Sequence, residues 1–226
     1  MRQSIENNGN QDPTPTIHPA DERRERIGAE VLAHMYAKYG VEFNIRGHDW
    51  DRHRDRLTLY PVWGTFEGER VDVQRRVVDG GVVFSDSYFG IMIREDVEAE
   101  VLGMLSEVDL PMKAFYNRGT SSFDNMFDGT KTFADLRQWR ADEGIPWSPI
   151  IALVVSYDGD KENHEAVAEK IFDALIEKGF RGLVGVAILP DEVFAKATRI
   201  NRDELYREFS ESVTIRSRNI SPQGGN

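Results

Sequence analysis

The chain has 226 residues, of which 40% are hydrophobic and 30% charged, and its formal net charge is −11. This composition is too apolar for a disordered chain and supplies enough Val, Ile, Leu and Phe for a buried core. The acidic balance argues against nucleic acid and anionic membrane surfaces as partners, because both are bound through clustered Lys and Arg.

The sequence contains no cysteine, which excludes disulfides, thiolate nucleophiles and thiolate metal sites. No apolar run approaches the roughly 20 residues of a membrane span, so we expect no membrane insertion. The N-terminus leads into polar residues without the apolar segment of a signal peptide, which predicts a cytoplasmic protein. A leader already removed from the sequence would leave an exported or surface form open.

The first ordered element is predicted to be a helix. Residues 1–18 are polar and indicate a flexible tail, and residues 219–226 indicate another. Between about Pro19 and Tyr39 the apolar residues recur every four positions, which predicts a helix with one buried stripe. Gly40 is suited to end this helix.

Residues 41–85 are predicted to form strands. Apolar and polar residues alternate, as in Val71, Asp72 and Val73, which is typical of a strand with one buried face. The sequence Asp79-Gly80-Gly81 separates two valine pairs and predicts a hairpin, because glycine adopts positive φ at low cost. We therefore expect an antiparallel meander with one solvent-facing side.

Two helices and a short strand are predicted next. An amphipathic helix is expected over about residues 94–108, with Glu95 and Asp96 placed favourably for the helix dipole. A strand is expected over residues 113–117. Thr132 is a predicted N-cap of a short helix that ends near Gly144.

The rest of the chain indicates a βαβ unit. Residues 150–155 and 183–189 are continuous apolar runs, typical of strands buried on both faces, and a helix is predicted between them over about residues 160–178. A helical stretch over 191–209 and a strand over 213–217 follow. The expected fold is α+β: an antiparallel meander with flanking amphipathic helices and a βαβ-like second half, sharing one core in a single domain over 19–218.

The segment from Gly47 to Arg56 is the first candidate for chemistry. It contains His48, His53 and three aspartates, which are residue types that bind metals. The two histidines are five positions apart in an expected loop between strands, and the three arginines of the segment would oppose a cation. The alternative is a solvent-exposed connection held by local ion pairs.

A second candidate metal site begins at Asp158. Carboxylates at Asp158, Asp160, Glu162 and Glu169 imitate the spacing of a calcium-binding EF-hand, but Asn163 stands where that loop needs glycine. Acidic residues also stabilise the start of a helix, so capping of the following helix is the alternative.

A candidate partner-binding loop spans residues 121–129. It carries Phe123, Met126 and Phe127 among polar residues. These side chains either pin the loop to the core or form an exposed contact surface.

Two short strings resemble a known group of proteins. Lys38-Tyr39-Gly40-Val41-Glu42-Phe43 and Asp86-Ser87-Tyr88-Phe89-Gly90 together resemble uncharacterised proteins from Gram-positive bacteria. The resemblance covers the first half of the chain and implies neither an activity nor a catalytic residue. Members of that group are described as surface lipoproteins, whose lipobox cysteine has no counterpart here, so surface anchoring is not carried over.

Two functions are compatible with these patterns. The sequence has no nucleophile elbow, no phosphate-binding loop and no zinc-protease motif, and no cofactor is indicated. The first hypothesis is a non-catalytic protein, immunity-like or regulator-like, whose acidic surface binds a basic partner. The alternative is a metal-dependent enzyme or metal-binding protein that uses the His48–His53 loop or the Asp158–Glu169 segment.

Overall fold

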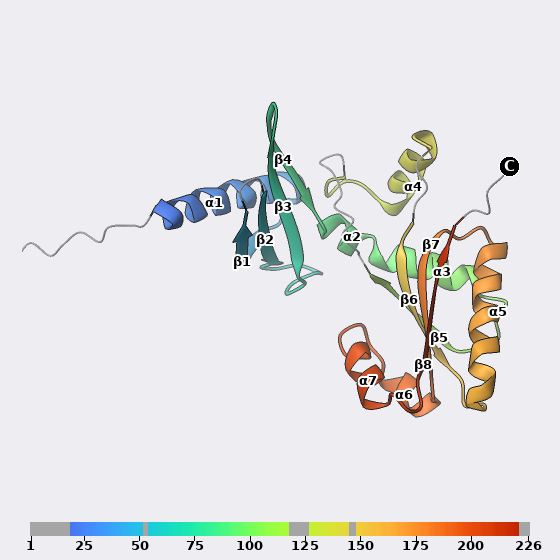
Figure 1. The fold of residues 1–226 in the computed structure, drawn as a ribbon. Coiled ribbons are helices and arrows are strands. Elements are labelled where there is room, and N and C mark those ends of the chain that lie inside the picture. The colour runs from blue at the N-terminus through green and yellow to red at the C-terminus, as the bar shows by residue number, and fades with distance from the viewer. Residues whose placement is uncertain (1–18, 52–53, 118–126, 145–147, 222–226) are drawn as a thin grey trace, which may run out of the picture.

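The computed structural model describes residues 19–51, 54–117, 127–144 and 148–221. Within these ranges the chain forms two four-stranded sheets, each with its own helices (Figure 1). The predicted α+β class is confirmed. None of the described helices is long and apolar enough to cross a membrane. Both predicted tails lie mainly outside the described residues.

The helix α1 (Pro19–Tyr39) covers one face of the first sheet. Ile27, Val31 and Met35 form the buried stripe that their spacing predicted. The helix ends at Gly40, which has a φ of 66° and donates its N–H to the carbonyl of Tyr36 at 2.8 Å. The predicted helix is therefore confirmed at both ends.

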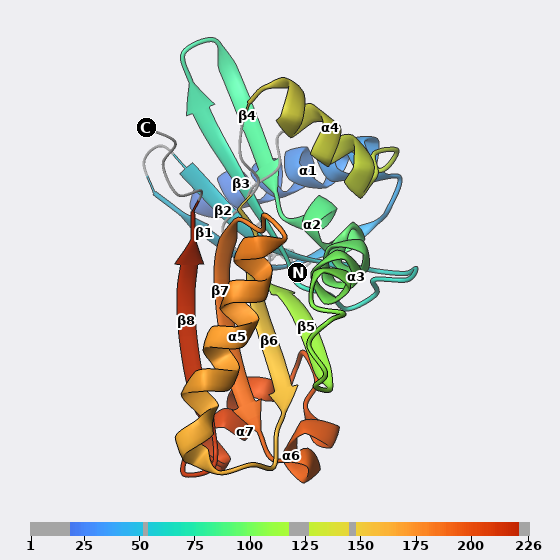
Figure 2. The same cartoon turned by 90° about the vertical axis from the view of Figure 1, so that its right-hand side faces the viewer.

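The first sheet is an antiparallel meander in the order β1-β2-β3-β4. Its strands are β1 (Phe43–Trp50), β2 (Arg54–Pro61), β3 (Val71–Val78) and β4 (Gly81–Asp86). Strands β3 and β4 form the predicted hairpin, with Gly80 at a φ of 104° and Gly81 at 148°. The hairpin extends beyond α1 in both side views (Figures 1 and 2).

The prediction of a loop over residues 47–56 was wrong, because most of this segment lies in strands. Strand β1 continues to Trp50 and β2 begins at Arg54, so His48 and Asp55 both lie in strands. The polarity of this segment hides the strand pattern, because His48 and Asp55 point to the helix-covered face and bind each other there. A bulge between Ile45 and Gly47 also shifts the alternation of β1.

Two helices lead from the first sheet to the first strand of the second. The helix α2 (Tyr88–Met92) was not predicted, and α3 (Arg94–Met104) ends four residues earlier than expected. The strand β5 (Met112–Asn117) and the helix α4 (Phe133–Asp142) follow. Thr132 caps α4 as predicted, in a capping box with Asp135.

The second sheet has the order β5-β6-β7-β8. Strands β6 (Ile150–Ser156) and β7 (Gly182–Leu189) are parallel and are joined through the short helix η1 (Lys161–Asn163) and α5 (His164–Glu177), which confirms the βαβ unit. Helix α5 lies on one side of this sheet, and the helices α6 and α7 on the other (Figures 1 and 2).

The C-terminal part differs from expectation in two respects. The stretch over 191–209 consists of two helices, α6 (Asp191–Lys196) and α7 (Arg202–Glu208), because Asn201 Oδ1 accepts hydrogen bonds from the backbone N–H and the hydroxyl of Thr198 between them. The last strand, β8 (Thr214–Ile220), ends three residues beyond the predicted strand end at residue 217 and two beyond the predicted domain end at residue 218. Ile220 is 5% exposed and packs in the core, which explains the extension.

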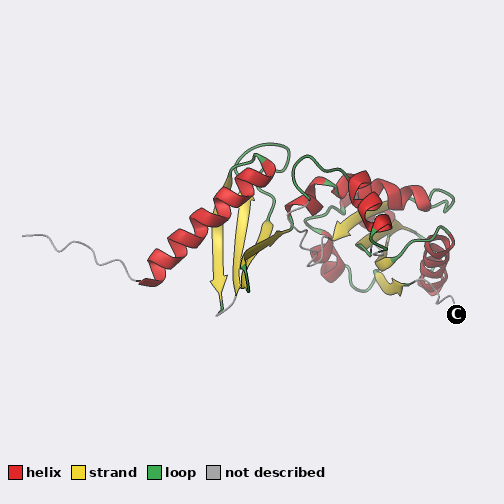
Figure 3. Cartoon of the chain, turned by 90° about the horizontal axis from the view of Figure 1, so that it is seen from above, coloured by secondary structure: helices red, strands yellow, loops and turns green. Residues whose placement is uncertain are grey.

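Buried side chains gather in three clusters. One lies between α1 and the first sheet, one between the second sheet and α3, α4 and α5, and one between the second sheet and α6 and α7. Tyr39 packs against both the first and the second cluster. Figure 3 shows the two sheets and their helices from above.

Candidate binding surfaces

The predicted metal ligand His48 lies in a buried charged cluster. Asp55 is 2% exposed and accepts hydrogen bonds from Arg23 Nη2 at 2.9 Å and Arg75 Nη1 at 3.3 Å. The Nε2 atom of His48 lies 3.2 Å from the same carboxylate. Arg23 also stands over the ring of Trp50, 5.5 Å from its centroid. The cluster joins α1 to three strands and compensates the one buried carboxylate with several donors.

This geometry gives no metal centre in the described part of the chain. Two guanidinium groups already face the Asp55 carboxylate, and a cation would be repelled by them. Within the described ranges, no three His, Asp or Glu residues gather as metal ligands do. His53 lies outside the described residues.

The carboxylates of the second candidate metal site point to separate partners. Asp158 Oδ1 accepts the N–H of Asp191 at 2.9 Å, at the start of α6. Asp160 precedes η1 without a side-chain capping bond, and Glu169 forms an ion pair with Arg218 at 2.6 Å. Asp158 therefore accepts an N–H at the start of α6 and does not cap the helix that follows it in the sequence, as we expected. The adjacent ends of β6 and β7 bring the start of α6 next to Asp158.

Phe127 is the one of the three candidate contact residues of the predicted loop that lies in the described ranges. It is 4% exposed and packs against Phe89 and Trp139, with ring centroids 5.0 and 5.2 Å away. Its carbonyl accepts a hydrogen bond from the Tyr39 hydroxyl at 3.2 Å. Phe127 is thus part of the core and not of a contact surface. Phe123 and Met126 lie outside the described residues.

The two strings that carried the resemblance meet at a buried polar cluster. The Asp86 carboxylate accepts hydrogen bonds from Lys38 Nζ at 2.7 Å, from the Tyr39 hydroxyl at 2.8 Å and from the backbone of Tyr88 at 2.9 Å. The side chain of Asp86 is fully buried and that of Lys38 is 4% exposed. Burial, reinforced by the Asp86 charge, raises the pKa of Tyr39, so its hydroxyl stays protonated and donates. The cluster joins α1 to the start of α2 and has a structural role.

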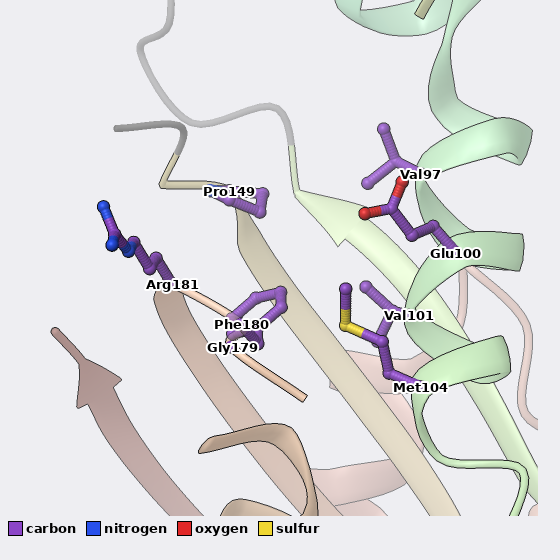
Figure 4. Close-up of a pocket in the computed structure, with 8 residues that line it drawn as sticks. All are labelled: Val97, Glu100, Val101, Met104, Pro149, Gly179, Phe180 and Arg181. Carbon is purple, nitrogen blue, oxygen red and sulfur yellow. The ribbon is translucent and has the colours of Figure 1, made fainter. Parts of the chain in front are cut away.

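A small apolar hollow lies between α3 and the second sheet. Its volume is about 120 Å³, and Figure 4 shows its lining, which includes the apolar Val97, Val101, Met104 and Phe180 and the charged Glu100 and Arg181. Ligand pockets usually measure roughly 300–1,000 Å³. This hollow has room for one aliphatic side chain and not for a cofactor.

The tip of the β3–β4 hairpin carries exposed apolar side chains, which the sequence analysis did not identify as a site. Val77, Val78 and Val82 are 58%, 45% and 38% exposed. Val77 and Val82 stand directly opposite each other in the register, and Val78 is opposite Gly81. The signal in the sequence was the pair of valines on each side of the glycine turn, which we interpreted only as a hairpin.

Comparison with known proteins does not place the chain in a family. No family model matches the sequence, and no curated protein matches it. Among solved structures, the chain is similar to a DUF5037 family protein from Ruminococcus gnavus. The match has 11% sequence identity, covers 75% of this chain and 78% of that chain, and has a TM-score of 0.39.

Proposed function

We propose that this chain is a non-catalytic binding protein that contacts a protein partner through the tip of the β3–β4 hairpin. The observation that carries the proposal is the exposure of Val77, Val78 and Val82 on one projecting turn. Clustered apolar side chains on a protruding element mark contact sites more often than scattered ones do.

The hairpin is well suited to binding. Its register is fixed by six residue pairs between β3 and β4, so little conformational entropy is lost when a partner covers it. Val77 and Val82 lie on one face of the hairpin and Val78 on the other. Because full burial of a valine side chain contributes roughly 1.5–3 kcal/mol, burial of the half-exposed Val77 and Val82 would contribute on the order of 1–3 kcal/mol.

We further propose that the partner is basic where it meets the second half of the chain, as expected for an immunity-like or regulator-like protein. The whole chain carries a formal net charge of −11. Glu165, Asp173 and Glu177 are exposed on α5. An acidic surface accelerates encounter with a basic one and loses affinity as salt screens the charges.

Affinity capture tests both parts of this proposal. The full chain is used as bait in lysate of the source organism, at low and at high salt, and captured proteins are identified by mass spectrometry. We expect a stoichiometric partner that is lost at high salt. The double variant Val77→Ser, Val82→Ser should lose this partner at low salt as well, because the apolar contact is removed.

A matched control separates the hairpin from general surface effects. Ile200→Ser changes an apolar residue that is 95% exposed between α6 and α7, on the side of the second sheet opposite α5, and it should retain the partner. Circular dichroism must show that all variants are folded. Equal capture by the hairpin variant and the wild-type chain would overturn the hairpin contact, and capture that ignores salt would overturn the electrostatic part.

A further inference from the structure

The face of the first sheet opposite α1 is open and carries a group of arginines. In the register, Arg54 of β2 stands directly opposite Arg76 of β3, and Arg56 lies two residues further along β2 on the same face. Arg46, at the bulge of β1, borders an open hollow of about 550 Å³ on this side, whose lining also includes Tyr60 and the carboxylate of Glu67. Arg46, Arg54, Arg56 and Arg76 are called the arginine face below.

The side chains of the arginine face form few ion pairs within the described ranges. Arg46, Arg56 and Arg76 are exposed and form no hydrogen bond or ion pair with any residue in the described ranges. Among the described residues, Arg54 forms an ion pair with the exposed Asp51, at 3.2 Å, and with no other carboxylate. Like charges directly opposite each other destabilise a sheet, so the pairing of Arg54 with Arg76 favours a bound anion.

On the inner face of the same sheet, under α1, the arginine of β3 is paired with carboxylates. There, Arg75 forms ion pairs with Glu30 at 2.9 Å and with Asp55 at 3.3 Å. The neighbouring arginine, Arg76, points to the outer face and has no such carboxylate. On the face under α1, the arginine is therefore paired with carboxylates. On the opposite face, Arg76 is available to a ligand.

We propose that the arginine face binds an extended acidic segment of a partner protein, with Asp or Glu at alternate positions. Alternate side chains of an extended segment are about 6.6–6.8 Å apart. Arg56 and Arg76 are diagonal neighbours on adjacent strands, a relation that places residues roughly 7–8 Å apart. Successive carboxylates can thus each meet a guanidinium, in the bidentate geometry that arginine favours. The inference rests on the proposed protein-binding function and adds the chemistry of the bound segment.

A protein segment fits this face better than a nucleic acid. Asp49 stands opposite Arg56, and Asp72 stands opposite Thr58 on the same face. A continuous phosphate backbone would be brought against these carboxylates, whereas a peptide can place neutral side chains beside them. The net charge of −11 also repels a long polyanion more than a short acidic segment.

Fluorescence anisotropy with the full chain tests the inference. The probes are a labelled ten-residue peptide of alternating Glu and Ser, the corresponding Lys–Ser peptide and a single-stranded oligonucleotide. We expect the Glu–Ser peptide to bind, with an affinity that falls as salt rises. Arg56→Glu and Arg76→Glu should each weaken it about tenfold or more. Arg76→Glu places a carboxylate opposite Arg54, so the sheet should remain folded.

Arg26→Glu on α1 is the matched control, because Arg26 is exposed on the other side of the sheet; it should bind the peptide like the wild-type chain. Absence of peptide binding, equal binding of the Lys–Ser peptide, or wild-type affinity in both arginine variants would overturn the inference. Binding of the oligonucleotide in place of the peptide would overturn it in favour of nucleic acid. The hairpin proposal is tested separately by capture, since Val77→Ser, Val82→Ser should leave the peptide affinity unchanged.

Discussion

Replacing Asp86 with asparagine should remove a large part of the stability of this protein. The Asp86 side chain is fully buried and lies 2.7 Å from the ammonium group of Lys38, which is only 4% exposed. Asparagine keeps the size of the side chain but removes its charge, so the Lys38 ammonium loses the carboxylate that compensates it. Tyr39, which donates to the same carboxylate at 2.8 Å, loses its charged acceptor as well.

The magnitude follows from the burial of both charges. Removal of one partner of a buried ion pair costs about 3–5 kcal/mol, compared with a total stability of roughly 5–15 kcal/mol for a typical domain. Each kcal/mol lowers Tm by roughly 2–4 °C in a chain of this size. Urea unfolding followed by circular dichroism should therefore show a much lower midpoint with an unchanged m-value.

Two further variants make this prediction refutable. Asp72→Asn removes an ion pair with Arg70 in which both side chains are more than half exposed, and it should cost about 0–1 kcal/mol. Lys38→Met added to Asp86→Asn should restore much of the stability, because no unpaired charge remains buried. The reasoning is refuted if Asp86→Asn costs no more than Asp72→Asn, or if Lys38→Met gives no recovery.

Two other residues give independent tests. His34 stacks on Phe84 with ring centroids 4.2 Å apart, and burial followed by the charge of Lys38 lowers its pKa below the ordinary 6.5. The unfolded chain then binds a proton more readily than the folded one, so stability should fall as pH drops below about 6.5. His34→Gln should lose less than the wild-type chain between pH 7.5 and 5.5 in urea titrations, and an identical loss would contradict the assignment. Phe127→Ala should cost about 3–5 kcal/mol in the same assay, because the ring is buried in the core; a cost below about 1 kcal/mol would show that Phe127 does not pack there.

Local patterns were sufficient for most of the secondary structure. The stripe of Ile27, Val31 and Met35 defined α1, and the valines around Gly80 and Gly81 defined the hairpin. Such features depend on residues a few positions apart, which a helix or strand brings together regardless of the rest of the fold. The polar segment around His48 and Asp55 was predicted wrongly, because its side chains are buried by ion pairs and not by apolar contacts.

The sequence by itself determined the helices α1 and α5, the meander, the βαβ unit and the overall acidity of this protein. Only the tertiary structure decided which charges are compensated. Lys38 meets Asp86 and Arg23 meets Asp55 across more than thirty positions of sequence, and neither pairing follows from local spacing. The same holds for the arginine face: alternation along β2 and β3 divides the residues between two sides, but the packing of α1 decides which side is buried with carboxylates and which is left open.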